Sequence, residues 1–133
     1  MLLEYEAWIG VDLCFQNFKQ ELADLPGKYA RPRGRLLIAD PNAGCVALRP
    51  IDDETGEMKR LFVRPEFRGT GLGKLLVLRV IEEARAVGFK KVRLDTMPMM
   101  ESAQKLYQSL GFRDIEPYRL NPQPGVRYME LSL

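Results

Sequence analysis

The sequence predicts one mixed α/β domain built on a single sheet. Its 133 residues fit one domain, 1–133, and are enough to bury a core without disulfides or metal ions. Short apolar runs of strand length alternate with amphipathic helical stretches, and turn-forming residues separate them. No internal repeat or linker interrupts this order.

The first 25 residues are predicted to be helical, because their apolar side chains recur mostly at helical spacing. Gly10 divides this stretch into two short helices, and Pro26-Gly27 ends it.

Three antiparallel strands follow, and clusters of turn residues separate them. The strands are expected at Arg35–Ala39, Cys45–Leu48 and Glu57–Val63. Pro65 ends the third strand, because proline cannot donate to a strand ladder.

The second half alternates helices with strands. A long amphipathic helix begins after a glycine-rich turn, with a buried stripe from Leu72 to Val87, and ends at Gly88. The remaining elements are a strand at Lys91–Thr96, a helix at Glu101–Leu110, and strands at Phe112–Ile115 and Val126–Leu131.

The composition excludes several classes of function. The chain has no histidine, which rules out Ser-His-Asp and Cys-His catalysis and the common zinc sites. Cys14 and Cys45 are isolated, so a reducing, cytoplasmic setting is expected. The net charge of +2 argues against a nucleic-acid partner, and no apolar run approaches the ~20 residues of a membrane span. No signal peptide is expected.

The glycine-rich turn 68–73 between a strand and a helix predicts an anion site, since backbone N–H groups and the helix dipole favour phosphate there. It is not a Walker A loop, which needs glycine at Arg68 and Ser or Thr at Leu75. It is not a Rossmann fingerprint either, because its glycines fall as GxGxG. The alternative is a tight strand-to-helix turn without a ligand.

Two segments resemble the GCN5-related N-acetyltransferase (GNAT) family. Residues 68–73, Arg-Gly-Thr-Gly-Leu-Gly, are similar to its acetyl-CoA loop, [Arg/Gln]-x-x-Gly-x-[Gly/Ala]. Residues 103–112, Ala-Gln-Lys-Leu-Tyr-Gln-Ser-Leu-Gly-Phe, are similar to its second segment, Ala-x-x-Leu-Tyr-x-x-x-Gly-Phe. The resemblance covers residues 35–133 and implies a GNAT-like acyl-CoA N-acyltransferase fold with acetyl-CoA as co-substrate and no metal.

The resemblance also implies where acetyl-CoA binds. The pyrophosphate is expected on the N–H groups of the glycine turn, and the pantetheine arm beside the third strand, which must splay from its neighbour. Met100 stands where relatives carry an asparagine that holds this arm, so Ser102 or Glu101 is expected to replace that contact. The implied cofactor residues are Leu61, Phe62, Val63, Arg68, Gly69, Thr70, Gly71, Leu72, Gly73, Lys74 and Ser102.

Two residues are implied in catalysis. Tyr107 matches the tyrosine that protonates the departing thiolate, and its alternative is a packing role. Glu57 matches the strand glutamate that acts as base, for which a raised pKa is expected. The alternative is that Glu57 pairs with Lys59 or Arg49.

The acceptor is expected to be a small primary amine. Its pocket candidates are Trp8, Phe15, Phe18, Tyr29, Tyr118 and residues 121–125, and the helical spacing of Phe15 and Phe18 favours a core role for these two. Arg31, Arg33, Arg119 and Arg127 are candidates for binding an acidic group, and the alternative that is favoured for most of them is surface charge. The family's usual first strand is expected to be absent, and an open sheet edge favours a homodimer. The alternative function is a non-catalytic acetyl-CoA sensor.

Overall fold

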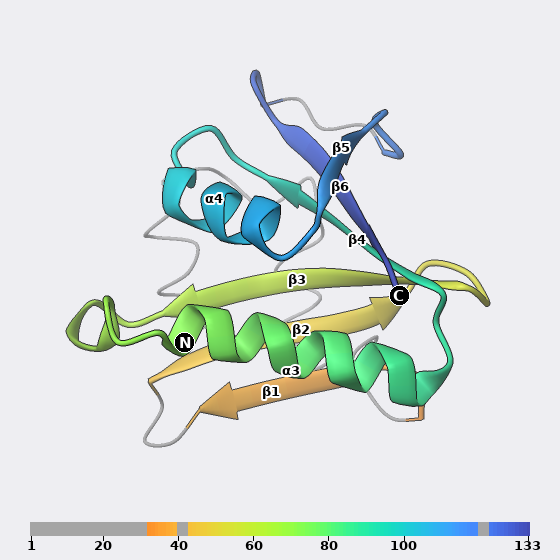
Figure 1. Ribbon diagram of the computed structural model, residues 1–133, viewed down its shortest axis with the longest axis horizontal. Coiled ribbons are helices and arrows are strands. Elements are labelled where there is room, and N and C mark those ends of the chain that lie inside the picture. The colour runs from red at the N-terminus through yellow and green to blue at the C-terminus, as the bar shows by residue number, and fades with distance from the viewer. Residues whose placement is uncertain (1–31, 40–42, 120–122) are drawn as a thin grey trace.

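The computed structural model describes residues 32–39, 43–119 and 123–133. Within them, six strands form one mixed sheet in the order β1-β2-β3-β4-β6-β5 (Figure 1). The strands are β1 (Arg35–Ala39), β2 (Gly44–Pro50), β3 (Thr55–Val63), β4 (Lys91–Thr96), β5 (Arg113–Ile115) and β6 (Arg127–Ser132). The predicted fold class is confirmed, and each of these strands lies within two residues of its expected range. The predicted N-terminal helices and the question of a preceding strand lie outside the described residues.

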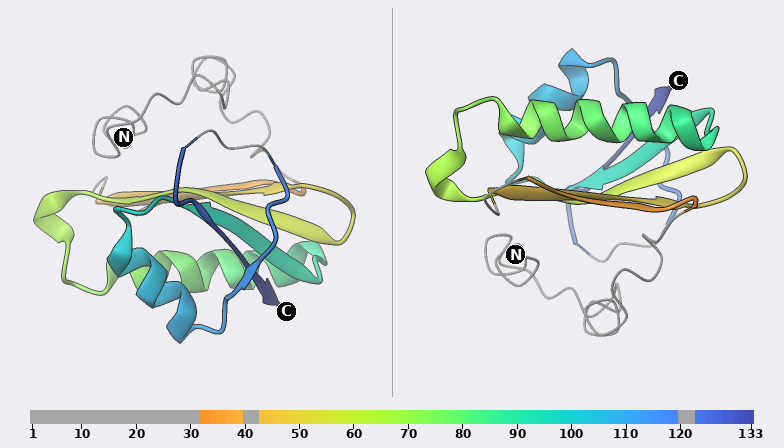
Figure 2. Two further views of the ribbon diagram at one scale, coloured as in Figure 1. Left: turned by 90° about the horizontal axis from the view of Figure 1, so that it is seen from above. Right: turned by 90° about the horizontal axis from the view of Figure 1, so that it is seen from below.

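Two helices cover one face of this sheet (Figure 2). They are α3 (Leu72–Val87) and α4 (Glu101–Ser109), and a short 3-10 helix, η3 (Pro65–Phe67), precedes α3. None of the described helices is long and apolar enough to cross a membrane.

The core lies between α3 and the sheet. Val77, Val80 and Ala84 from α3 are fully buried against Leu48 of β2 and Leu94 of β4. Methyl-rich side chains on one stripe of the helix thus meet the alternating inward side chains of the strands, and the hydrophobic effect fixes the helix on this face.

The gap between β3 and β4 positions the site. The two strands pair in parallel only from Thr55 to Glu57 on β3 and from Lys91 to Arg93 on β4. Beyond that they diverge, as Figure 1 shows, because β4 continues along β6 while β3 continues along β2. The expected splay is therefore confirmed, and it opens a gap at the carboxyl ends of both strands.

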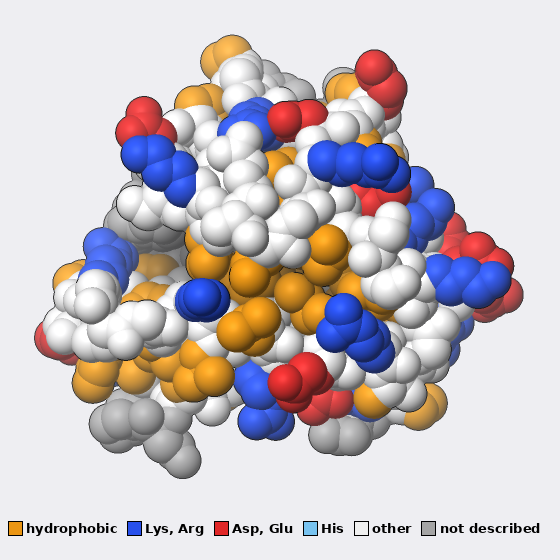
Figure 3. Space-filling model, viewed as in Figure 1, with side chains coloured by type: hydrophobic (Ala, Val, Ile, Leu, Met, Phe, Trp, Pro, Cys, Tyr) orange, Lys and Arg blue, Asp and Glu red, His pale blue; other side chains and the backbone are white. Residues whose placement is uncertain are grey.

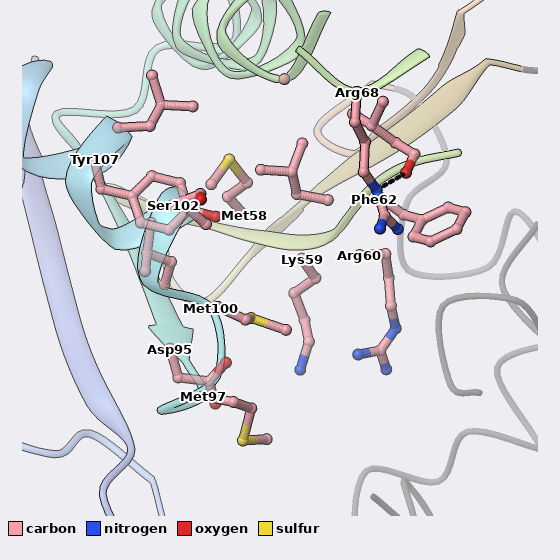
Figure 4. Close-up of a pocket in the computed structure, with 16 residues that line it drawn as sticks. Met58, Lys59, Arg60, Phe62, Arg68, Asp95, Met97, Met100, Ser102 and Tyr107 are labelled. Atoms are coloured by element: carbon pink, nitrogen blue, oxygen red, sulfur yellow. Dashed lines mark hydrogen bonds between the residues drawn. The ribbon is translucent and has the colours of Figure 1, made fainter. Parts of the chain in front are cut away.

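A bulge in β3 changes how its side chains face this gap. The pairing with β2 shifts register between Cys45 and Ala47, where β3 carries one extra residue, and Arg60 has a φ of 61°. Such a left-handed conformation is uncommon for a residue other than glycine and marks a local constraint. As a result, Lys59 and Arg60 point to the same side although they are neighbours in sequence (Figure 4).

Candidate active site

A cavity of about 230 Å³ fills the gap between β3 and β4. On the face that carries both helices, hydrophobic side chains gather between α4 and α3 (Figure 3). The lining residues are Met58, Lys59, Arg60, Leu61, Phe62, Val63, Arg68, Gly73, Leu94, Asp95, Met97, Met100, Ser102, Ala103, Leu106 and Tyr107. One wall thus comes from β3 and the start of α3, and the other from β4 and α4.

The turn before α3 leaves room for a ligand. Gly69 and Gly71 have φ values of 80° and 86°, and a Cβ on either would meet nothing within 4 Å. Gly71 is the N-cap of α3 and no side chain caps the helix, while Leu75 donates the first helical hydrogen bond back to Gly71 at 3.1 Å. The backbone N–H groups of the first turn therefore need a partner outside the helix, which an anion supplies.

One side chain ties this turn to β3, and another ties it to η3. Arg68 Nε donates to the Val63 carbonyl at 2.9 Å (Figure 4), and its guanidinium lies 5.8 Å from the Phe62 ring. Thr70 Oγ1 donates to the Phe67 carbonyl at 2.6 Å. Lys74 is exposed at the start of α3 and does not line the cavity.

Helix α4 brings the predicted acid to the cavity. Tyr107 is 5% exposed, lines the cavity, and packs its ring against Phe112 with 5.6 Å between centroids. The packing contact is thus present, and the acid role stays a prediction. Ser102 and Met100 also line the cavity, whereas Glu101 does not.

Glu57 lies beside the cavity in a buried ionic cluster and does not line it. Its side chain is fully buried, and Oε1 accepts from Arg49 Nε at 2.7 Å. Oε2 accepts from the Tyr118 hydroxyl at 2.7 Å and from Arg119. The alternative of pairing with Arg49 is therefore confirmed, and both carboxylate oxygens are occupied.

The expected raised pKa of Glu57 is wrong. Burial raises the pKa of this carboxyl, but the charges of Lys59, Arg49 and Arg119 and the Tyr118 hydrogen bond together hold the pKa below its usual value. Surrounding cations favour the carboxylate form. The base role of Glu57 stays a prediction, and these contacts do not favour it.

The sequence reasoning missed three charged residues of the cavity, Lys59, Arg60 and Asp95. Lys59 on β3 is 6% exposed, and within the described residues its ammonium makes no hydrogen bond or ion pair. Asp95 near the end of β4 has a buried Oδ2 without a partner in the same part of the chain. Burial lowers the pKa of Lys59 to about 8, although Glu57 and Asp95 raise it. The available signal was a charged side chain inside each strand.

Among the described residues, none of the predicted acceptor residues lines the cavity. Arg33 pairs with Asp53, and Arg127 pairs with Asp114. Tyr118 and Arg119 belong to the Glu57 cluster, while Trp8, Phe15, Phe18, Tyr29, Arg31 and residues 121–122 lie outside the described residues. No group of three His, Cys, Asp or Glu side chains in the described ranges fits a metal ion.

Comparisons with known proteins agree with this geometry. The model of the acetyltransferase (GNAT) family matches residues 5–112. An uncharacterized N-acetyltransferase of Schizosaccharomyces pombe is 43% identical over 138 residues, which cover 100% of this chain and 85% of that protein.

Solved structures share the fold. An acetyltransferase from Streptococcus agalactiae has a TM-score of 0.77 at 27% identity and covers 97% of this chain and 83% of its own. A GNAT family acetyltransferase from Elizabethkingia anophelis with acetyl-CoA bound has a TM-score of 0.64 at 28% identity, and the match covers 75% of this chain and 76% of that protein. The chain belongs to the GNAT family of acetyltransferases.

Proposed function

We propose that this protein transfers an acetyl group from acetyl-CoA directly to the primary amine of a small acceptor. The observation that carries the proposal is the cavity between the splayed strands, which runs from the first turn of α3 to Tyr107. The same family relationship and a similar structure with acetyl-CoA bound support it.

The residues present fit acetyl-CoA at two places. The open glycine turn offers the first-turn N–H groups of α3 to the pyrophosphate, where the helix dipole favours negative charge. After Glu57, β3 has no strand partner on its β4 side within the described residues. The backbone of Leu61–Val63 is therefore suited to pair with the amides of the pantetheine arm as an added strand would.

The chemistry assigns a role to each wall of the cavity. A backbone N–H near Phe62 or Val63 donates to the oxyanion that forms as the amine adds to the thioester carbonyl. The ammonium of the acceptor first gives one proton to solvent, and the neutral amine then adds to the thioester carbonyl. The C–N bond forms, the C–S bond breaks, and the nitrogen loses its second proton to solvent. Tyr107 gives its phenolic proton to the departing thiolate and is reprotonated by water, since a phenol with an ordinary pKa near 10 is protonated at neutral pH.

Thiol release from acetyl-CoA in the presence of primary amines tests the proposal. We expect amine-dependent release by the wild-type protein and a loss of turnover in Tyr107→Phe, with acetyl-CoA binding retained. Acetyl-CoA binding without turnover on any amine would favour the alternative, a sensor. No binding by a folded sample would contradict both.

A further inference from the structure

Lys59 and Asp95 carry opposite charges on the two walls of the cavity. Lys59 comes from β3 and Asp95 from β4, and both line the cavity. Their charges act on one another, yet no ion pair joins them in the described part of the chain. Asp95 Oδ2 is buried and has no hydrogen-bond partner there. Lys59 is thus almost entirely removed from water and Asp95 is half-buried with one buried oxygen, and neither has a direct counter-ion among the described residues.

Such an arrangement is unfavourable for folding alone. A buried charge that makes no ion pair or hydrogen bond loses hydration without compensation, so buried charges in proteins are usually paired. Glu57 follows this rule, because Arg49, Tyr118 and Arg119 surround it. Lys59 and Asp95 depart from the rule inside a cavity, where a ligand supplies the missing partners.

We propose that the acceptor is zwitterionic, an amino acid whose carboxylate binds Lys59 and whose ammonium binds Asp95. This inference rests on the proposed function and names its substrate class. A molecule with both charges supplies a counter-ion to Lys59 and to Asp95 at once. A simple amine, or the side chain of a lysine within a protein, leaves Lys59 unpaired.

The positions of the side chains fit this orientation. In Figure 4, Lys59, Arg60 and Asp95 point to the same end of the cavity, whereas Tyr107 and Ser102 enter from α4. Asp95 holds the reacting amine on the β4 wall, opposite the Leu61–Val63 strand along which the acetyl group is proposed to lie.

Two thioether side chains lie at the same end of the cavity as Lys59 and Asp95. Met97 and Met100 line the cavity after β4. Methionine is flexible and polarizable, so this wall suits an apolar side chain on the acceptor without fixing its shape.

Matched pairs of acceptors test the inference. The twenty standard amino acids and their α-carboxamides are assayed side by side by thiol release from acetyl-CoA. The amide keeps the amine and the side chain but removes the negative charge. We expect at least one amino acid to have a kcat/KM about 10- to 100-fold above that of its amide, the range expected for a charged hydrogen bond.

Variants connect this preference to the two residues. Lys59→Met is expected to raise the KM for the amino acid by about 10- to 100-fold and to leave the amide unchanged, so that the preference disappears. Lys59→Arg is expected to restore part of it. Asp95→Asn is expected to raise the KM for both the amino acid and its amide, because both carry the ammonium. Lys105→Met, an exposed lysine of α4 outside the cavity, is the matched control.

The outcomes separate this inference from the proposed function. If the wild-type protein acetylates amides or plain amines as well as amino acids, or acetylates no amino acid while binding acetyl-CoA, the inference is wrong and the cofactor assignment remains. If Lys59→Met keeps the preference, Lys59 is not the carboxylate partner. Absence of acetyl-CoA binding would instead contradict the proposed function.

Discussion

Replacing Lys59 by methionine should make the protein more stable while it removes part of the active site. Methionine keeps most of the length of lysine and fits a wall that already contains Met58 and Met97. The pKa of Lys59 is lowered from 10.5 to about 8, with burial as the main cause. A difference of one in pKa corresponds to about 1.4 kcal/mol, so the buried ammonium disfavours the folded state by about 3 kcal/mol at pH 7.

The pH dependence follows from the direction of the shift. Because the pKa of Lys59 is lower in the folded state, the unfolded chain binds more protons between about pH 8 and pH 10.5. The free energy of unfolding of the wild-type protein therefore rises with pH in this window. The increase in the free energy of unfolding caused by Lys59→Met should fall from about 3 kcal/mol at pH 7 to about 1 kcal/mol at pH 9.5. The charges facing Lys59 are Glu57, Arg60, Asp95 and Arg119.

Urea and thermal denaturation of wild-type protein and variant at these two pH values measure this difference. The expected increase in melting temperature at pH 7 is about 10 °C for a domain of this size. Lys105→Met, on the exposed face of α4, should change stability by less than about 0.5 kcal/mol at either pH. A variant less stable than wild type at pH 7, or a gain that does not shrink at pH 9.5, would refute the reasoning.

Three further predictions concern the cofactor site and the ionic cluster. Gly71→Glu should abolish acetyl-CoA binding in calorimetry, because it places bulk and negative charge at the turn. Gly73→Ala should retain binding and raise the free energy of unfolding by up to about 1 kcal/mol, since Gly73 has ordinary helical geometry and a Cβ there would meet only Val63. Equal acetyl-CoA binding by both variants would contradict the assignment of the turn as the pyrophosphate site. Tyr107→Phe should lower kcat by about 100-fold or more with an unchanged Kd for acetyl-CoA, and an unchanged kcat would leave the tyrosine only its packing role. Glu57→Gln should lower the free energy of unfolding by about 3 kcal/mol, because it removes the buried carboxylate that the half-buried Arg49 and Arg119 pair with. A stable variant with lost turnover would instead favour the base role.

The regular elements were predictable because their signals are local. Helix α3 shows an apolar stripe, a glycine turn before it and Gly88 after it, and all three lie within one stretch of sequence. Strands β1 to β4 show apolar runs bounded by turn residues. Their ends moved by up to two residues, because the pairing partner, rather than the local sequence, decides where a strand stops.

The electrostatics of the site were not predictable in the same way. Glu57 matched a motif, but its partners Tyr118 and Arg119 lie 61 and 62 residues away in sequence, and only the fold brings them together. Lys59 and Asp95 line one cavity only because β3 and β4 stop pairing after Glu57 and Arg93. The bulge at Arg60, which turns two neighbouring side chains to one side, leaves no recognisable pattern in the sequence.

Calorimetric titration of the purified chain with acetyl-CoA, with ATP as the control, tests the central claim most directly. We expect saturable acetyl-CoA binding that Gly71→Glu removes, and no comparable binding of ATP. A folded protein that binds ATP but not acetyl-CoA, or binds neither, would contradict it.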